Sequence, residues 1–183
     1  AHRELGNALI AQGKGDEAIA CYKRVLELTP DNAAAHRDLA MAYKTLGKTD
    51  EAERALEESF ELDPERKDLV MAAEHQRAGE FAKAEEICRS ILRRDPRNVN
   101  ATRMLGLLAR DLGKNRLAAR MLRNAVKLAP DFYGARLDLA RALIEIDELD
   151  ECEQLLKDSI RMQPDMPANY AALGNLYSKR GEF

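Results

Sequence analysis

The residue types that carry catalysis are present in this sequence, but none of them has a known catalytic spacing. The run Gly13-Lys14-Gly15 looks like a fragment of a phosphate-binding loop, yet no Gly-Lys-Ser or Gly-Lys-Thr follows it. The three histidines, His2, His36 and His75, lack the His-Glu-x-x-His or paired-cysteine spacing of a metal site. No Gly-x-Ser-x-Gly motif indicates a nucleophile. The sequence therefore predicts no enzyme activity, no cofactor and no metal site.

The three cysteines, Cys21, Cys88 and Cys152, are odd in number and far apart. A disulfide framework typically has an even number of closely spaced cysteines, so reduced thiols fit this sequence better. Each cysteine lies among alanine, leucine and isoleucine, which favours the role of a small buried hydrophobic residue. This pattern predicts a cytoplasmic protein.

Composition excludes several classes of protein. The chain has 183 residues, of which 45% are apolar and 33% charged, enough to form a core. Its 29 Lys+Arg and 32 Asp+Glu give a net charge of −3, which does not favour binding to nucleic acid or to an anionic membrane. No apolar run approaches the roughly 20 residues that span a bilayer. Ala1 is neither an initiator methionine nor part of a signal-like stretch, so we expect a piece of a longer protein.

An internal repeat organises the chain. The prolines that follow apolar runs are 34, 32, 34 and 34 residues apart: Pro30, Pro64, Pro96, Pro130 and Pro164. A second marker has the same period and the same two-residue contraction: Gly13, Gly47, Gly79, Gly113, Asp147 and Gly181. Each of these six positions is expected to hold the left-handed residue that ends a helix. Two independent markers with one period predict repeats of two helices each.

Packing positions recur within each repeat. A large apolar residue in the first helix is always followed by a small one, as in Leu39-Ala40 and Leu105-Gly106, which lets a neighbouring helix approach closely. Such a helix pair cannot bury both of its faces alone, so the pairs must stack. We predict an all-α, right-handed superhelix (an alpha-alpha solenoid) of helix-turn-helix repeats without strands. Its five repeats are 1–32, 33–66, 67–98, 99–132 and 133–166, and 167–183 is the first helix of a truncated sixth.

Two local features are also expected. Asp16, Thr49 and Asp150 lie near the starts of second helices, where their side chains are predicted to cap free amides. The third repeat is two residues short after Pro64, which predicts a kink or looser packing there.

These residues resemble the tetratricopeptide repeat (TPR) family. Its pattern of large, small and turn residues is seen in the fourth repeat as Leu105-Gly106, Ala109, Gly113, Ala118, Leu122, Ala125 and Pro130. The likeness extends over essentially the whole chain. It departs from the family where His2, His36, Thr102 and Arg136 replace an opening tryptophan.

The resemblance implies a non-catalytic scaffold whose first helices line a concave groove that binds a peptide or partner segment. The groove residues that it implies are Arg3, Asn7, Arg37, Met41, Lys44, Arg66, Arg103, Leu107, Arg110, Arg141, Asn175 and Lys179. With Arg77, the groove positions carry nine cations against Asp111 and Glu145. A basic groove would bind acidic or carboxylate-terminated peptides. Alternatively, these cations are ordinary solvated residues of exposed helix faces.

More specific functions of the family fit less well. The carboxylate clamp of co-chaperones matches Arg3, Asn7 and Arg66, but Asp38 stands where it needs asparagine and Val70 where it needs a cation. Two broader alternatives stay open. The chain is a regulatory or substrate-presenting segment of a larger enzyme, such as a bacterial sulfotransferase-like transferase, or it self-associates through the uncapped edge near Phe183.

Overall fold

The computed structural model describes residues 1–181; residues 182 and 183, the end of the predicted segment 167–183, lie outside the described residues. Residues 1–181 form eleven α-helices and no strand, which confirms the all-α class. The helices are α1 (His2–Ala11), α2 (Gly15–Leu28), α3 (Ala33–Thr45), α4 (Thr49–Leu62), α5 (Pro64–Arg77), α6 (Phe81–Arg94), α7 (Val99–Asp111), α8 (Asn115–Leu128), α9 (Tyr133–Glu145), α10 (Leu149–Met162) and α11 (Pro167–Arg180). None of these helices is both long and apolar enough to cross a bilayer.

The turn between the two helices of a repeat depends on one left-handed residue. The glycines at the predicted positions have φ angles from 70° to 76°, and Asp147 has a φ of 64°. These values confirm the predicted role of the turn position. Glycine adopts this conformation without a steric penalty, whereas aspartate adopts it at some cost.

Helix capping differs from the sequence prediction. The residues that precede α2, α4 and α10 are Lys14, Lys48 and Glu148, and none of them caps its helix through a side chain. Asp16, Thr49 and Asp150 lie inside the first turn, where a carboxylate interacts favourably with the helix dipole but cannot act as the N-cap. The prediction that these three residues are N-caps was therefore wrong.

The N-cap role belongs instead to three residues that precede first helices: Asn32, Asn98 and Asp63, whose carboxylate accepts a hydrogen bond from the Arg66 amide at 3.0 Å. The side chain of Asn32 accepts a hydrogen bond from the Ala35 amide at 3.0 Å, and that of Asn98 accepts one from the Ala101 amide at 2.9 Å. Each bond satisfies an amide at the start of its helix that has no partner within the helix.

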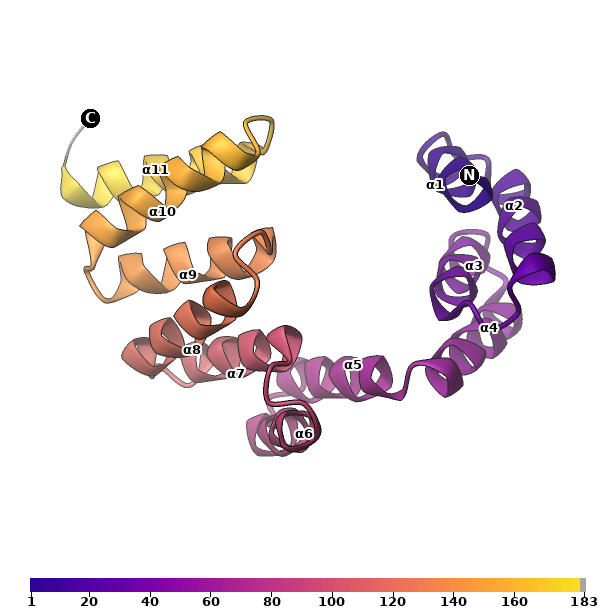
Figure 1. Ribbon diagram of the computed structural model, residues 1–183, viewed down its shortest axis with the longest axis horizontal. Coiled ribbons are helices and arrows are strands. Elements are labelled where there is room, and N and C mark those ends of the chain that lie inside the picture. Colours follow the sequence, from indigo (N-terminus) through magenta and orange to yellow (C-terminus); the bar gives the residue numbers. More distant parts are fainter. Residues whose placement is uncertain (182–183) are drawn as a thin grey trace. The chain divides into compact units, whose positions relative to one another are not determined.

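The chain divides into two compact units. Unit 1 comprises residues 1–67, and unit 2 begins at Asp68. In unit 1 each helix from α1 to α4 packs on the next one, and the two first helices α1 and α3 also touch (Figure 1). Its core is formed by Leu9, Ile19, Tyr22 and Leu39, together with small residues such as Ala18 and Ala55.

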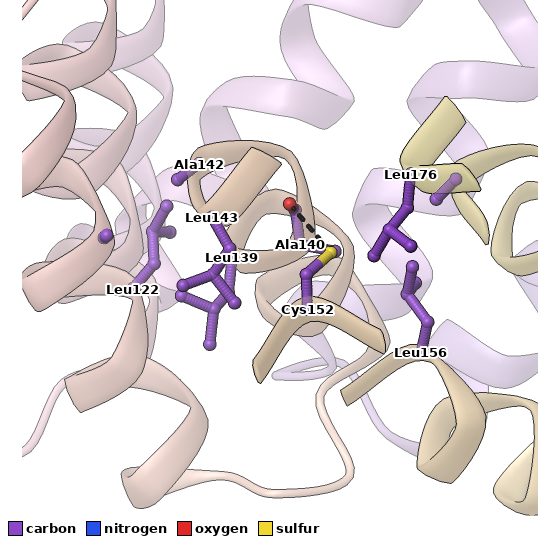
Figure 2. Close-up of a cluster of buried hydrophobic side chains, with 10 residues drawn as sticks. Leu122, Leu139, Ala140, Ala142, Leu143, Cys152, Leu156 and Leu176 are labelled. Atoms are coloured by element: carbon purple, nitrogen blue, oxygen red, sulfur yellow. Dashed lines mark hydrogen bonds between the residues drawn. The ribbon is translucent and has the colours of Figure 1, made fainter. Parts of the chain in front are cut away.

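Unit 2 repeats the same arrangement over more helices. The helices α6 to α11 pack in sequence order, and the first helices α7, α9 and α11 contact one another in turn (Figure 1). Figure 2 shows the larger core of this unit, where Leu139 and Leu143 of α9 lie beside Leu122 of α8, and Leu156 of α10 faces Leu176 of α11. The first helices α1 and α3 of unit 1, and α7, α9 and α11 of unit 2, therefore form a row within each unit that is supported by the second helices.

The third repeat is packed more loosely than the others, as its shortened sequence predicts. A single residue, Asp63, separates α4 from α5, whereas four residues separate α2 from α3. Ala72 is the one buried residue of α5, fewer than in any other described helix. The boundary between the two units falls within α5. Because α5 buries only one small side chain, it contributes little apolar surface to the hydrophobic core.

Candidate functional site

The predicted groove residues all lie on first helices of the repeats. Arg3 and Asn7 are on α1; Arg37, Met41 and Lys44 are on α3; Arg66 is in the first turn of α5; Arg103, Leu107 and Arg110 are on α7; Arg141 is on α9; and Asn175 and Lys179 are on α11. In unit 1 α1 touches α3, and in unit 2 α7, α9 and α11 touch in turn. The structure therefore groups the residues of α1 and α3 into one set and those of α7, α9 and α11 into another, while Arg66 of α5 belongs to unit 1.

Two of the predicted arginines are held by aspartates of the next first helix. The Nε atom of Arg3 donates to Asp38, and that of Arg103 donates to Asp138 at 2.6 Å. Asp138 is only 4% exposed, and the Arg103 guanidinium also lies 5.6 Å from the centre of the Phe132 ring. These arginines link one repeat to the next, and their charge is already balanced.

Three further cations of the predicted groove have acidic neighbours in unit 2. Arg141 lies 3.6 Å from Asp138, the carboxylate that also binds Arg103, and Arg110 lies 3.4 Å from Asp111. Lys179 donates to the Ile144 carbonyl and lies 3.7 Å from the Asp147 carboxylate. The first-helix face of unit 2 is therefore much less basic than the sequence count implied.

The remaining cations are Arg37, Lys44, Arg66 and Arg77, and none of the four forms an ion pair with any residue in 1–181. All except Arg77 belong to unit 1. Arg37 is half-buried, and burial together with the nearby positive charge of Arg66 lowers the pKa of its guanidinium. An arginine in this state gains free energy from an added carboxylate, which supplies the missing countercharge.

An open cleft adjoins these unpaired cations in unit 1. It has a volume of about 420 Å³ and is lined by α3 and α4. Arg37 and Lys44 supply the positive charge and Glu53 the single carboxylate, while Met41 and Leu56 supply the large apolar surface. Met41 is 59% exposed and Leu56 is 37% exposed. We call this feature the α3–α4 cleft; it brings together three of the residues that the sequence analysis selected.

The uncharged members of the predicted set differ in their surroundings. Asn7 accepts a hydrogen bond of 2.7 Å from the hydroxyl of Tyr22, which is itself buried in the core of unit 1. Leu107 is half-buried on α7, and Asn175 is exposed on α11. Asn7 therefore helps to orient a core side chain, whereas Asn175 stays available to solvent.

The residues that the sequence reasoning missed are Asp38 and Asp138. Asp38 was named in the sequence analysis only as a departure from the carboxylate clamp, and the effect of either aspartate on the neighbouring arginine was not counted. The signal that identifies them is a spacing of 35 residues, since Arg3 pairs with Asp38 and Arg103 with Asp138. A residue placed one position after the repeat period lies beside its partner on the next first helix.

Two of the three cysteines are buried within the helix cores. Burial raises the pKa of the Cys88 and Cys152 thiols to about 11, so both stay protonated and unreactive at neutral pH. In residues 1–181 no three of His, Cys, Asp and Glu are placed to hold a metal ion. What the first helices offer a partner is positive charge beside exposed apolar surface.

Stacked helix pairs with contiguous first helices define an α-helical repeat protein, a class of protein-interaction scaffold. Four family profiles described as TPR or tetratricopeptide repeats match residues 6–47, 33–66, 69–113 and 109–177. The chain belongs to the tetratricopeptide repeat family. No curated protein is a significant match to it in sequence.

Several solved structures share its fold. A chain of the APC/C hetero-tetramer Cut9-Hcn1 is similar with a TM-score of 0.69 and 16% identity, over 99% of this chain and 36% of that one. The thermophilic TPR protein TTC0263 of Thermus thermophilus has a TM-score of 0.65 and 21% identity, over 96% of both chains. A mutant of the Thermobaculum terrenum O-GlcNAc transferase has a TM-score of 0.54 and 30% identity, over 63% of this chain and 22% of that one. The present chain thus spans about a third of the first of these proteins and about a fifth of the last.

Proposed function

We propose that this chain binds an acidic peptide or partner segment on its first-helix face, and that the α3–α4 cleft of unit 1 is the anchoring point. One observation carries the proposal. Three of the four groove cations without a carboxylate partner belong to unit 1, and two of these three, Arg37 and Lys44, line a cleft that exposes Met41 and Leu56. We further propose that the protein acts in the cytoplasm, which its three free cysteines support.

The geometry of α3 suggests what such a segment carries. Arg37 and Lys44 are seven residues apart on one helix, about 10 Å along its axis. A carboxylate at Arg37 forms a charge-assisted, bidentate contact and relieves the repulsion by Arg66. A large apolar side chain between the two cations covers Met41 and Leu56, which removes apolar surface from water. The expected ligand therefore combines carboxylates with at least one large apolar residue.

A charge-reversal experiment tests the proposal. The probe is a fluorescein-labelled peptide with the sequence Asp-Leu-Leu-Glu between glycines, titrated with the chain and followed by fluorescence anisotropy. The double variant Arg37→Glu/Lys44→Glu is expected to weaken binding at least fivefold. The matched control Lys14→Glu/Arg54→Glu changes the net charge of unit 1 equally at exposed residues outside the cleft, and it should bind within twofold of the original chain. Equal weakening by both variants would show that only overall charge matters.

A second candidate function is that of a regulatory or substrate-presenting segment attached to a transferase. The likeness to an O-GlcNAc transferase, of which this chain matches 22%, supports it. In that case the parent gene product contains a catalytic domain beyond these repeats. Transferase assays with and without residues 1–181 would test it: loss of activity toward protein acceptors, with activity toward small acceptors retained, is the expected result. Equal loss toward both kinds of acceptor would contradict a presenting role.

A further inference from the structure

A second candidate surface lies in unit 2, on the side of α7 opposite its predicted groove residues. Leu105, Leu108 and Leu112 recur at helical spacing on this side, about half a turn from Arg103 and Arg110. They form the floor of a groove of about 290 Å³, whose walls are α6 and α8. Leu112 is 42% exposed at this floor. We call this feature the α6–α8 groove.

Positive charge surrounds the apolar floor. Arg89 of α6, Lys114 at the start of α8 and Arg120 of α8 line the groove together with one carboxylate, that of Glu85. Arg89 is bound to Glu85 at 2.6 Å. Lys114 and Arg120 form no ion pair with any residue in the described part of the chain. The groove therefore contains two cations that lack a countercharge.

The neighbouring groove between α8 and α10 shows that this excess of charge is local. It has nearly the same volume, about 280 Å³, and its apolar lining consists of Leu139 of α9, Val126 of α8 and Leu155 of α10. Its cations Arg123 and Lys127 are matched by Glu151 and Asp158, and Arg123 is bound to Glu151 at 2.6 Å. The charged side chains that line the α8–α10 groove cancel, whereas those that line the α6–α8 groove leave an excess of positive charge.

The start of α8 differs in charge from the starts of most other second helices. The first turns of α2, α4 and α10 each contain two acidic residues, whereas those of α6 and α8 contain none. Lys114, which precedes α8, makes no side-chain cap. The Glu145 carboxylate of α9 accepts a hydrogen bond of 3.3 Å from the side chain of Asn115, the first residue of α8. The preference of the groove for an incoming anion therefore rests on the unpaired side chains of Lys114 and Arg120.

We propose that the α6–α8 groove binds an extended peptide segment in which two carboxylates flank large apolar side chains. Lys114 and Arg120 are six residues apart on or beside α8, about 9 Å along the helix axis. An extended peptide spans that length in three residues, so the two carboxylates are three positions apart. A groove of about 290 Å³ admits one or two large side chains, whereas a helix of about 10 Å diameter does not fit in it. This surface is separate from the α3–α4 cleft and binds independently of it.

The experiment uses the same labelled Asp-Leu-Leu-Glu peptide, in which the carboxylates are three positions apart. The variant Lys114→Glu/Arg120→Glu is compared with the control Arg116→Glu/Arg93→Glu, which makes the same change in charge at exposed residues outside the groove. Far-ultraviolet circular dichroism verifies that each variant is folded. Amide chemical shifts of the ¹⁵N-labelled chain locate the bound peptide.

Support for the proposal requires three results. Lys114→Glu/Arg120→Glu raises the dissociation constant of one peptide-binding site at least fivefold, whereas the control variant binds the peptide within twofold of the original chain. Amide signals of Leu105, Leu108 and Leu112 shift on titration. Peptides with Asn-Leu-Leu-Gln or Asp-Ser-Ser-Glu in place of the probe sequence bind at least fivefold more weakly. The proposal is overturned if the amide signals of Leu105, Leu108 and Leu112 do not shift when the peptide is added. It is also overturned if Lys114→Glu/Arg120→Glu and the control Arg116→Glu/Arg93→Glu weaken peptide binding equally, or if Arg37→Glu/Lys44→Glu is the only double variant that abolishes peptide binding.

Discussion

The second and fourth repeats have the same local structure but different surroundings. Both first helices have 13 residues and an asparagine N-cap, and both second helices have 14 residues. Leu56 of α4 and Leu122 of α8 occupy equivalent positions in the two repeats. Leu122 is 0% exposed because α9 packs on α8, whereas Leu56 is 37% exposed. The repeat pattern thus defines a position within the helix pair, and the neighbouring helix decides how deeply that position is buried.

The same contrast holds for the charged residues. Arg103 of the fourth repeat is bound to Asp138, whereas the equivalent Arg37 has no ion pair within residues 1–181. An arginine bound by a carboxylate stabilises the stack of helices. An arginine without one is available to a ligand. The difference between the two repeats therefore separates structural residues from candidate binding residues.

The largest expected effect concerns the two leucines. Leu122→Ala should lower the free energy of unfolding by about 2–5 kcal/mol, because it removes buried apolar atoms and leaves a cavity. Leu56→Ala should lower it by less than about 1 kcal/mol, because its side chain is partly in water already. Urea denaturation followed by circular dichroism measures both. Equal losses would show that the two positions are buried to the same extent in solution.

A smaller loss is expected at the glycine that faces Leu122. A Cβ atom on Gly106 would lie 2.7 Å from Leu122 Cγ, so Gly106→Ala should destabilise the protein by about 1–3 kcal/mol through overpacking. Gly174 of α11 has no such neighbour within 4 Å, and Gly174→Ala should stabilise its helix by about 0.5–1 kcal/mol. In urea titrations the combined variant Gly106→Ala/Leu122→Ala should lose less than the sum of its parts. Additive losses would contradict a direct contact.

The arginine pair tests the division between structural and binding residues. Arg103→Met should cost about 1–3 kcal/mol of stability, because the buried carboxylate of Asp138 loses its closest partner. Arg37→Met should change stability by less than about 0.5 kcal/mol, since no carboxylate depends on it. Thermal unfolding of both variants in parallel measures the difference. A larger loss for Arg37→Met would place Arg37 among the structural residues.

Acid sensitivity should be the smallest effect and should be confined to unit 2. Hydrogen bonds from Lys157, Arg180 and Tyr177 lower the pKa of Glu153 to about 2, and a hydrogen bond from Arg123 lowers the pKa of Glu151. A glutamate whose pKa is lowered by folding stabilises the folded state at pH values above its pKa in the unfolded chain, about 4.3. This stabilisation is lost as the pH falls toward 2.

The free energy of unfolding, measured from pH 5 to pH 2, should fall as the pH is lowered. Glu153→Gln should make this dependence on pH less steep. Hydrogen exchange of amides assigns the loss to a unit. A slope that Glu153→Gln leaves unchanged, or that arises in unit 1, would contradict the assignment.

Part of the candidate site could be predicted from the sequence, and part could not. The selection of Arg37, Met41 and Lys44 needed only the repeat period, because residues at one helical position share one face. Their availability could not be predicted in this way. It depends on whether an aspartate follows 35 residues later: Arg103 has Asp138 at that spacing, whereas Arg37 has Ala72. Only the structure shows that residues at this spacing can lie side by side on successive first helices.

The sequence by itself determined the eleven helices, their turns and their order, because these depend on short-range constraints. A left-handed glycine or Asp147 ends a helix through its own backbone, whatever lies beyond it. Only the tertiary structure decided which leucine is buried, which arginine is paired and where a cleft is left open. Those outcomes depend on how closely one helix pair approaches the next, and this is set by side chains of different helices acting together.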